Sequence, residues 1–156
     1  MAIAIINLLP IITMRTKKAK KYDEQLDREI EKAVSRFSEH LMSNSKWVRL
    51  IDTLVDNASK IKKIEFKKVQ KNQIGELYLT EGTTYGFDYW QNGFEGHNSF
   101  GCWLVFKEIE YLVFPKVVNS DKQLEQDLTE IKDLIDKVGQ FFLDIDDNGI
   151  KLICYK

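Results

Sequence analysis

The sequence predicts an α+β protein, with a mostly antiparallel sheet of about five or six strands, two N-terminal helices and one later helix packed on one sheet face, and a closing C-terminal hairpin. Apolar residues recur at steps of three and four before residue 60 and again after residue 120. Between these segments the apolar period is two, which is typical of strands. An Asn-Gly pair between two apolar runs near the C-terminus indicates the hairpin.

Two amphipathic helices are expected before residue 60. The first begins at Tyr22 and spans about five turns, because charged residues fill the gaps between its apolar positions. Asn44 or Ser45 is the expected N-cap of the second helix. The expected buried residues are Tyr22, Leu26, Ile30, Ala33, Val34, Phe37 and Leu41 in the first helix and Trp47, Leu50, Ile51, Leu54, Val55 and Ala58 in the second.

Strands are expected from Ile61 onward. Ile64 and Phe66 alternate with charged residues, which predicts a strand with one solvated face. The segments "GELYLTEG" and "TTYGFDYW" predict two more strands, and "CWLVFKEIEYLVF" predicts one bent strand or two short ones that end at Pro115.

A third helix and a hairpin complete the predicted fold. Asn119 or Ser120 is the expected N-cap of this helix, and Gly139 suits its C-terminal cap. The hairpin is expected to turn at Asn148-Gly149, because both residue types tolerate positive φ. The helix residues expected to face inward are Leu124, Leu128, Ile131, Leu134, Ile135 and Val138.

The hairpin segment also resembles half of a calcium-binding loop. Asp144, Asp146, Asn148 and Gly149 occupy the first, third, fifth and sixth positions of such a loop. The twelfth position is Tyr155, which cannot supply the bidentate carboxylate, and a strand pattern replaces the exiting helix. The turn is therefore the favoured interpretation, and we expect no metal.

Length and composition favour one domain over residues 22–156. The chain has 156 residues, 44% of them hydrophobic, and a formal net charge of -1, so no overall field attracts nucleic acid or anionic lipid. Cys102 and Cys154 lack zinc-ligand spacing and favour a reduced, cytoplasmic setting. Residues 1–21 are apolar and then basic, without the order of a signal peptide or the length of a membrane helix. We expect a loose tail or a misassigned start, with translation beginning at Met14 or Met42.

Charge is unevenly distributed along the chain. Basic residues cluster between residues 15 and 21 and again between Lys60 and Lys71, whereas acids dominate from Asp121 to Asp147. This predicts a charge dipole that can steer partners.

The segment "TTYGFDYWQNGFEGHNSFGCW", residues 83–103, is the most unusual part of the chain. It combines seven aromatic residues with four glycines. Alternation along "YGFDYW" places an acid and a tryptophan on the same strand face, a combination found at interfaces. Burial of that face beneath a helix is the equally weighted alternative. We expect a partner to contact either one sheet face or the loop at residues 91–101. The expected contact residues are Tyr85, Asp88, Trp90, Phe94, Glu95 and His97.

Two other functions are compatible with the sequence. Asp88, Glu95 and His97 could form a ligand-binding or catalytic group, although a single histidine is weak evidence for a metal and no nucleophile or cofactor motif is present. The basic strand between Lys60 and Lys71 could bind nucleic acid through Lys62, Lys63, Lys67 and Lys68. Lysine is also the usual guard of an edge strand, and this disfavours nucleic acid.

The segments "MSNSKWVRLIDTL", "YGFDYWQNGFEG" and "CWLVFKEIEYLVF" resemble a group of small bacterial proteins known only as a domain of unknown function. The resemblance covers residues 42–156 and implies no catalytic residue or cofactor. At the level of class, the chain is similar to immunity proteins that neutralise toxins. This similarity implies a non-enzymatic, cytoplasmic protein that binds another protein, a basic toxin domain, near acidic side chains.

Overall fold

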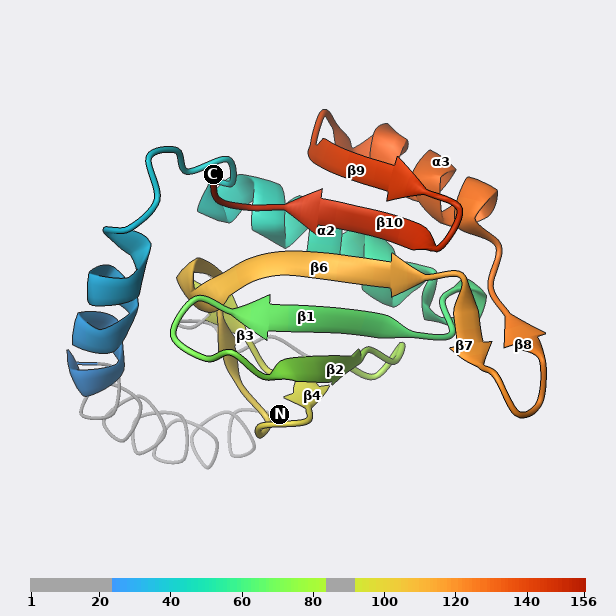
Figure 1. Ribbon diagram of the computed structural model, residues 1–156, viewed down its shortest axis with the longest axis horizontal. Helices are drawn as coiled ribbons and strands as arrows, with labels where there is room; N and C mark the ends of the chain where they lie inside the picture. The colour runs from blue at the N-terminus through green and yellow to red at the C-terminus, as the bar shows by residue number, and fades with distance from the viewer. Residues whose placement is uncertain (1–23, 84–91) are drawn as a thin grey trace, which may run out of the picture.

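The computed structural model, which describes residues 24–83 and 92–156, confirms the α+β class (Figure 1). Its main sheet has six strands in the order β4-β2-β1-β6-β10-β9, and all neighbouring strands are antiparallel. These strands are β1 (Ile64–Lys68), β2 (Ile74–Tyr78), β4 (His97–Asn98), β6 (Ile109–Pro115), β9 (Phe142–Asp146) and β10 (Gly149–Ile153). Two small sheets pair β3 (Gly93–Phe94) with β5 (Leu104–Val105) and β7 (Val117–Asn119) with β8 (Leu124–Glu125).

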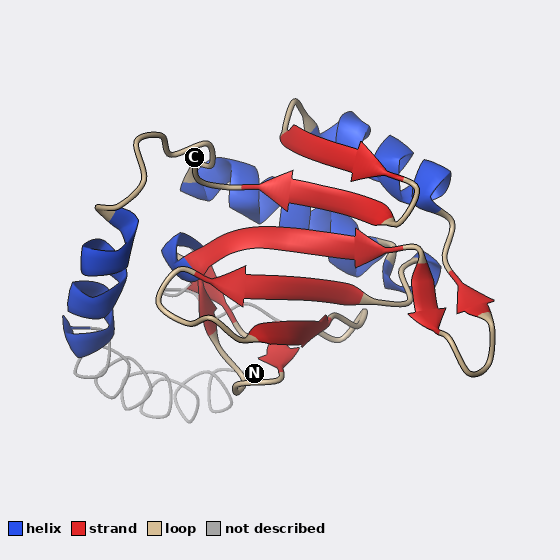
Figure 2. Cartoon of the chain, in the orientation of Figure 1, coloured by secondary structure: helices blue, strands red, loops and turns tan. Residues whose placement is uncertain are grey.

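Two helices cover one face of the main sheet, and no described helix covers the other (Figure 2). They are α2 (Asn44–Asp56) and α3 (Leu128–Val138). The core lies between these helices and the sheet, where alternate strand residues such as Phe66, Leu112 and Leu152 are fully buried. The alternation predicted from the sequence therefore sets which sheet face is covered.

The first helix ends earlier than predicted and lies at the end of the central strands. Among the described residues, 24–34 are helical, so Phe37 and Leu41 fall outside the helix. Ile30, Ala33 and Val34 form a separate small cluster with Val69 and Val105, which follow β1 and precede β6. The chain turns early because Ser38 and Glu39 donate backbone hydrogen bonds to the carbonyl of Lys156.

Both later helices begin at residues other than those predicted. Ser43 is the N-cap of α2, where its hydroxyl accepts a hydrogen bond from the N–H of Lys46 at 3.2 Å. The N-cap of α3 is Asp127, and the predicted caps Asn119 and Ser120 lie instead at the end of β7 and in the turn after it. Leu124 is therefore a half-exposed residue of β8, not a buried helix residue.

The strand predictions agree more closely with the structure. "CWLVFKEIEYLVF" forms two strands, β5 and β6, separated by a 3₁₀ turn at Phe106–Glu108, and β6 ends at Pro115 as expected. Gly139 is the C-cap of α3. The predicted strand "TTYGFDYW" lies almost wholly outside the described residues, as does the expected tail at residues 1–21.

The C-terminal hairpin is confirmed, with its turn one residue earlier than predicted. Asp147 and Asn148 form the turn, and Asp146 pairs with Gly149. The Asp146 carboxylate accepts hydrogen bonds from the N–H groups of Asn148 at 2.8 Å and Gly149 at 3.1 Å, so it stabilises the turn itself. Glycine is needed at 149 because an added Cβ would lie 2.8 Å from the carbonyl oxygen of Phe114 on β6.

No helix in the described parts of the chain is long and apolar enough to cross a membrane.

Candidate interaction surface

Half of the predicted contact residues can be placed in the structure. Tyr85, Asp88 and Trp90 lie outside the described residues. Phe94 is fully buried in β3, and its ring stacks on Phe106 with centroids 5.9 Å apart. The ring of Phe94 is therefore part of the core, not of the surface where a partner would contact it.

Glu95 and His97 lie beside β4 at one edge of the main sheet. Glu95 is half-buried, and His97 is exposed and pairs with Tyr78 of β2. Asp88, the third member of the predicted ligand-binding or catalytic group, lies outside the described residues. A pocket of about 140 Å³ between the end of α2 and strands β1 and β2 is lined by neither Glu95 nor His97. In the described segments, no three His, Cys, Asp or Glu side chains are grouped to hold a metal.

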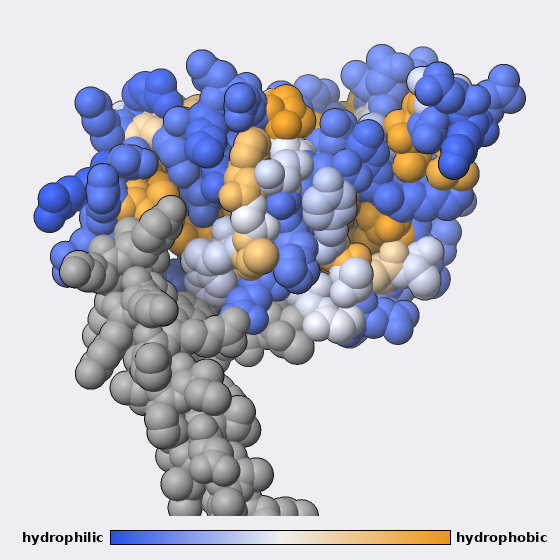
Figure 3. Space-filling view, turned by 90° about the horizontal axis from the view of Figure 1, so that it is seen from below, coloured by the Kyte–Doolittle hydropathy of each residue, from blue (hydrophilic) through white to orange (hydrophobic). Residues whose placement is uncertain are grey.

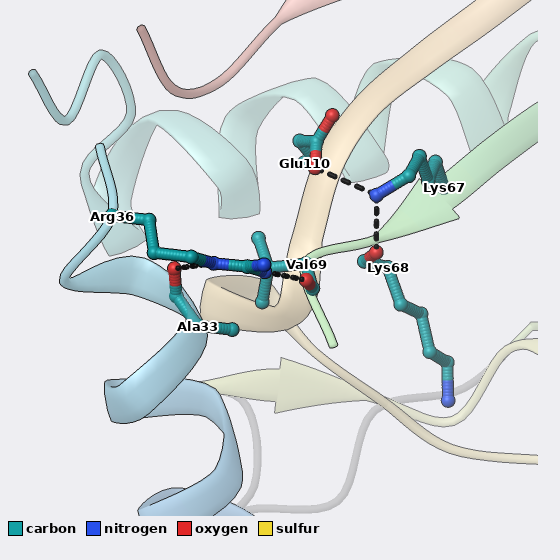
Figure 4. A network of polar contacts seen from close by, with 6 residues as sticks. All are labelled: Ala33, Arg36, Lys67, Lys68, Val69 and Glu110. Atoms are coloured by element: carbon teal, nitrogen blue, oxygen red, sulfur yellow. Dashed lines mark hydrogen bonds and ion pairs between the residues drawn. The ribbon is translucent and has the colours of Figure 1, made fainter. Parts of the chain in front are cut away.

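The basic segment from Lys60 to Lys71 makes many contacts within the chain. The ammonium of Lys67 lies 2.8 Å from the Glu110 carboxylate and also donates to the carbonyl of Lys68 (Figure 4). Lys68 lies 2.9 Å from a carboxylate oxygen of Glu108, and its side chain is only 12% exposed. Two of the four lysines considered for nucleic-acid binding are thus held in ion pairs, which reduces the free charge available to phosphates.

The uncovered face of the main sheet carries the exposed half of the strand pattern. Because Ile64 and Phe66 point to the core, the alternate residues of β1 point away from the helices, and the strand register extends this rule across the sheet. We call this surface the open face. It includes Glu65, Lys67, Ile74, Glu76, Tyr78, His97, Tyr111, Val113, Phe142, Asp144, Asp146, Lys151 and Ile153.

The open face has large apolar side chains near both of its edges. Ile74 and Tyr78 on β2 are 51% and 48% exposed, and Phe142 on β9 is 46% exposed. Figure 3 shows the side of the molecule on which β2 and β4 lie. The part of this side that is not drawn in grey is mainly hydrophilic, and its hydrophobic areas are separated from one another. Single apolar residues are ordinary on a surface, but their placement on one uncovered sheet face is typical of an interface.

The centre of the open face carries both opposite and like charges as neighbours, since Lys67 pairs with Glu110 whereas Glu65 lies directly opposite Glu76. Lys151 is directly opposite Asp144, and its ammonium lies 4.1 Å from the centre of the Tyr111 ring. Burial, and then the carboxylates of Glu110 and Glu65, raise the pKa of Tyr111 above its ordinary value, so the phenol is neutral at physiological pH. The face therefore presents neutral aromatic and aliphatic groups among acidic and basic side chains.

The sequence prediction of an interface did not identify Tyr111, Ile74 and Phe142. These three residues come from strands far apart in the chain, and only the strand order places them on one surface. Their signal in the sequence is the alternation within each strand, which identifies an outward face but not its neighbours.

The fold and the open face together define a two-layer α+β domain with one sheet face that no described helix covers. Comparison of the chain with protein-family models, curated proteins and solved structures gives no match.

Proposed function

We propose that this protein is a small, non-enzymatic bacterial domain that binds another protein through the open face. The observation that carries the proposal is the exposure of Ile74, Tyr78 and Phe142 around a charged centre on one sheet face. Aromatic and aliphatic side chains surrounded by polar groups are the composition of interface hot spots.

The partner that fits best is a basic protein. Residues 121–147 contain nine acidic residues and three lysines, and eight of the nine acids are exposed. This segment includes α3 and β9, so it borders the open face at the Phe142 edge. A negative border favours rapid association with a positive partner. The proposal therefore includes an immunity-type role in the cytoplasm, in which the partner is a toxin domain.

Affinity capture with two double variants, each of which loses two exposed apolar side chains, tests this proposal. Tyr78→Ser/Phe142→Ser removes two rings from the open face, and Val117→Ser/Leu124→Ser removes two exposed apolar side chains from the β7-β8 hairpin. We expect the wild type and the hairpin variant to retain the same cellular protein. The open-face variant should retain it at least about tenfold more weakly, because each anchor residue contributes roughly 2 kcal/mol.

Co-expression gives the functional readout. If the captured protein is toxic, growth should be rescued by the wild type and the hairpin variant but not by the open-face variant. Equal capture by both variants, or no protein retained by the wild type, would contradict the proposal.

A further inference from the structure

Strand β9 is an edge of the main sheet. Its only partner among the described strands is β10, and Figure 1 shows no described strand beyond it. An edge strand leaves the N–H and C=O groups of its outer side without sheet partners. β9 can therefore accept a further strand by backbone hydrogen bonding.

The side chains of β9 make this edge both apolar and acidic. Phe142 is 46% exposed and lies on the open face, whereas Ile145 is 47% exposed and lies on the helix side opposite Ile150. Asp144 and Asp146 share the face of Phe142 and are exposed. A strand docked here would meet carboxylates at alternate positions on one face and apolar groups on the other.

Cations from within the chain already contact this segment. The ammonium of Lys156 lies 3.6 Å from the centre of the Phe142 ring. Lys46 lies 5.6 Å from the ring centre of Phe141 and donates a hydrogen bond to the carbonyl of Gln140. The aromatic rings and acids of the segment thus have the chemistry that recognises ammonium and guanidinium groups.

A second copy of the chain fits this edge poorly in the two antiparallel registers centred on Asp144 and Ile145. Antiparallel self-pairing centred on Asp144 would place two Asp144 carboxylates opposite each other, and pairing centred on Ile145 would place Asp144 opposite Asp146. Like charges that are directly opposite destabilise a strand pair. The edge favours a positively charged strand over its own sequence.

We infer that β9 binds an extended segment of the partner in which lysine or arginine alternates with aliphatic residues, as an additional strand of the sheet. The inference rests on the proposed protein-binding function and specifies the partner's chemistry. The cationic side chains would lie beside Asp144 and Asp146, and the aliphatic ones would cover Ile145.

A synthetic capped peptide of alternating lysine and valine is the probe for this inference. We expect it to bind the full chain and to slow hydrogen exchange at β9 amides that point outward, because those amides gain a strand partner. A glutamate–valine peptide should bind at least about tenfold more weakly, and a lysine–glycine peptide should give no protection of β9.

Two matched variants separate strand addition from general attraction to acidic surfaces. Ile145→Lys adds a lysine at the β9 edge, and Leu124→Lys adds the same charge on the exposed strand β8. We expect at least about tenfold weaker binding of the lysine–valine peptide by Ile145→Lys and no change in Leu124→Lys. Equal loss in both variants, or binding without β9 protection, would overturn the inference.

A third variant is the control at a surface outside both the open face and β9. Val117→Ser/Leu124→Ser alters the separate β7-β8 hairpin and should bind the peptide as the wild type does. Failure of peptide binding with normal partner capture contradicts only the strand-addition inference. Peptide binding without any captured partner contradicts only the proposed function.

Discussion

Glu108 is a fully buried carboxylate whose oxygens all have partners. One oxygen accepts a hydrogen bond from the side-chain amide of Gln70 at 3.0 Å and lies 2.9 Å from the ammonium of Lys68. The other accepts from the backbone N–H of Val105 at 2.8 Å. The side chain is 1% exposed, so it joins the end of β1 to the turn before β6 out of contact with water.

We expect Glu108→Ala to destabilise the protein by about 3–5 kcal/mol, because it leaves the ammonium of Lys68 buried without its counter-charge. The double variant Lys68→Met/Glu108→Leu should be much closer to the wild type, since apolar residues replace both charges. Urea unfolding measures both values.

The exposed pair of Lys107 and Glu31 provides the control for this prediction. Its side chains are 56% and 61% exposed, so Glu31→Ala should cost less than about 1 kcal/mol. If Glu108→Ala costs no more than Glu31→Ala, the buried pair does not stabilise the fold as argued.

The sequence does not indicate that Glu108 is buried while its charged neighbours are more exposed. Lys107 is exposed and Glu110 is half-buried, and all three residues lie in the same strand-like segment. The difference arises from the 3₁₀ turn at Phe106–Glu108, which directs Glu108 inward toward β1. Phe94 was misjudged for a similar reason, because its burial depends on the pairing of β3 with β5.

At the scale of elements, the start of α3 shows how a distant contact can override a local pattern. Apolar residues at helical spacing predicted a helix from residue 120, but the helix begins at Leu128. Gln126 is buried just before it and donates to the carbonyl oxygens of Lys63 at 2.9 Å and Pro115 at 2.6 Å. These bonds fix an extended chain at this point, so β7 and β8 replace the first turns of the predicted helix.

Asp127→Ala tests the observed start of α3. The Asp127 carboxylate accepts a hydrogen bond from the N–H of Glu130 at 3.1 Å, and loss of such a cap costs about 1 kcal/mol. We expect that decrease in the free energy of unfolding measured with urea. Ser120→Ala, at the position predicted from the sequence, should change it by less than about 0.5 kcal/mol. A larger effect at Ser120 than at Asp127 would indicate that the helix begins at the earlier position predicted from the sequence.

The strands were predictable where one face is buried, because burial imposes the period of two. Ile64, Phe66 and the run that ends at Pro115 follow that rule directly. The order of the strands was not predictable, because β1 pairs with β6 across a long stretch of intervening chain. The composition of the open face depends on that order, so the sequence indicated a sheet-face interface without its residues.

At the scale of the whole molecule, the C-terminus joins the first helix to the sheet. Residues 154–156 bond to the connector after the helix through the carbonyl oxygens of Cys154 and Lys156. The Tyr155 ring packs 5.2 Å from Phe37, and its hydroxyl donates to the carbonyl of Lys107 at 2.7 Å. The small N-terminal cluster and the main core therefore meet at Tyr155, which packs against both.

Two titratable groups at this junction predict loss of stability in alkali. Burial raises the pKa of the Cys154 thiol, with a further contribution from Glu110, and burial also raises the pKa of Tyr155. Above the thiol's ordinary pKa, the unfolded chain loses this proton while the folded chain keeps it. The unfolded state then binds fewer protons, so the free energy of unfolding falls as pH rises.

We expect stability to be fully retained up to about pH 8 and to fall above about pH 9, with a slope approaching 1.4 kcal/mol per pH unit from a fully buried thiol. Urea unfolding between pH 7 and pH 11 measures this slope. Cys154→Ala should lower stability at neutral pH but flatten the alkaline decline, because the group that titrates is removed. Cys102→Ala, which removes the exposed thiol, should keep the wild-type slope. If stability declines in alkali as steeply in Cys154→Ala as in the wild type, titration of the Cys154 thiol is not the cause of the decline, and the prediction is wrong.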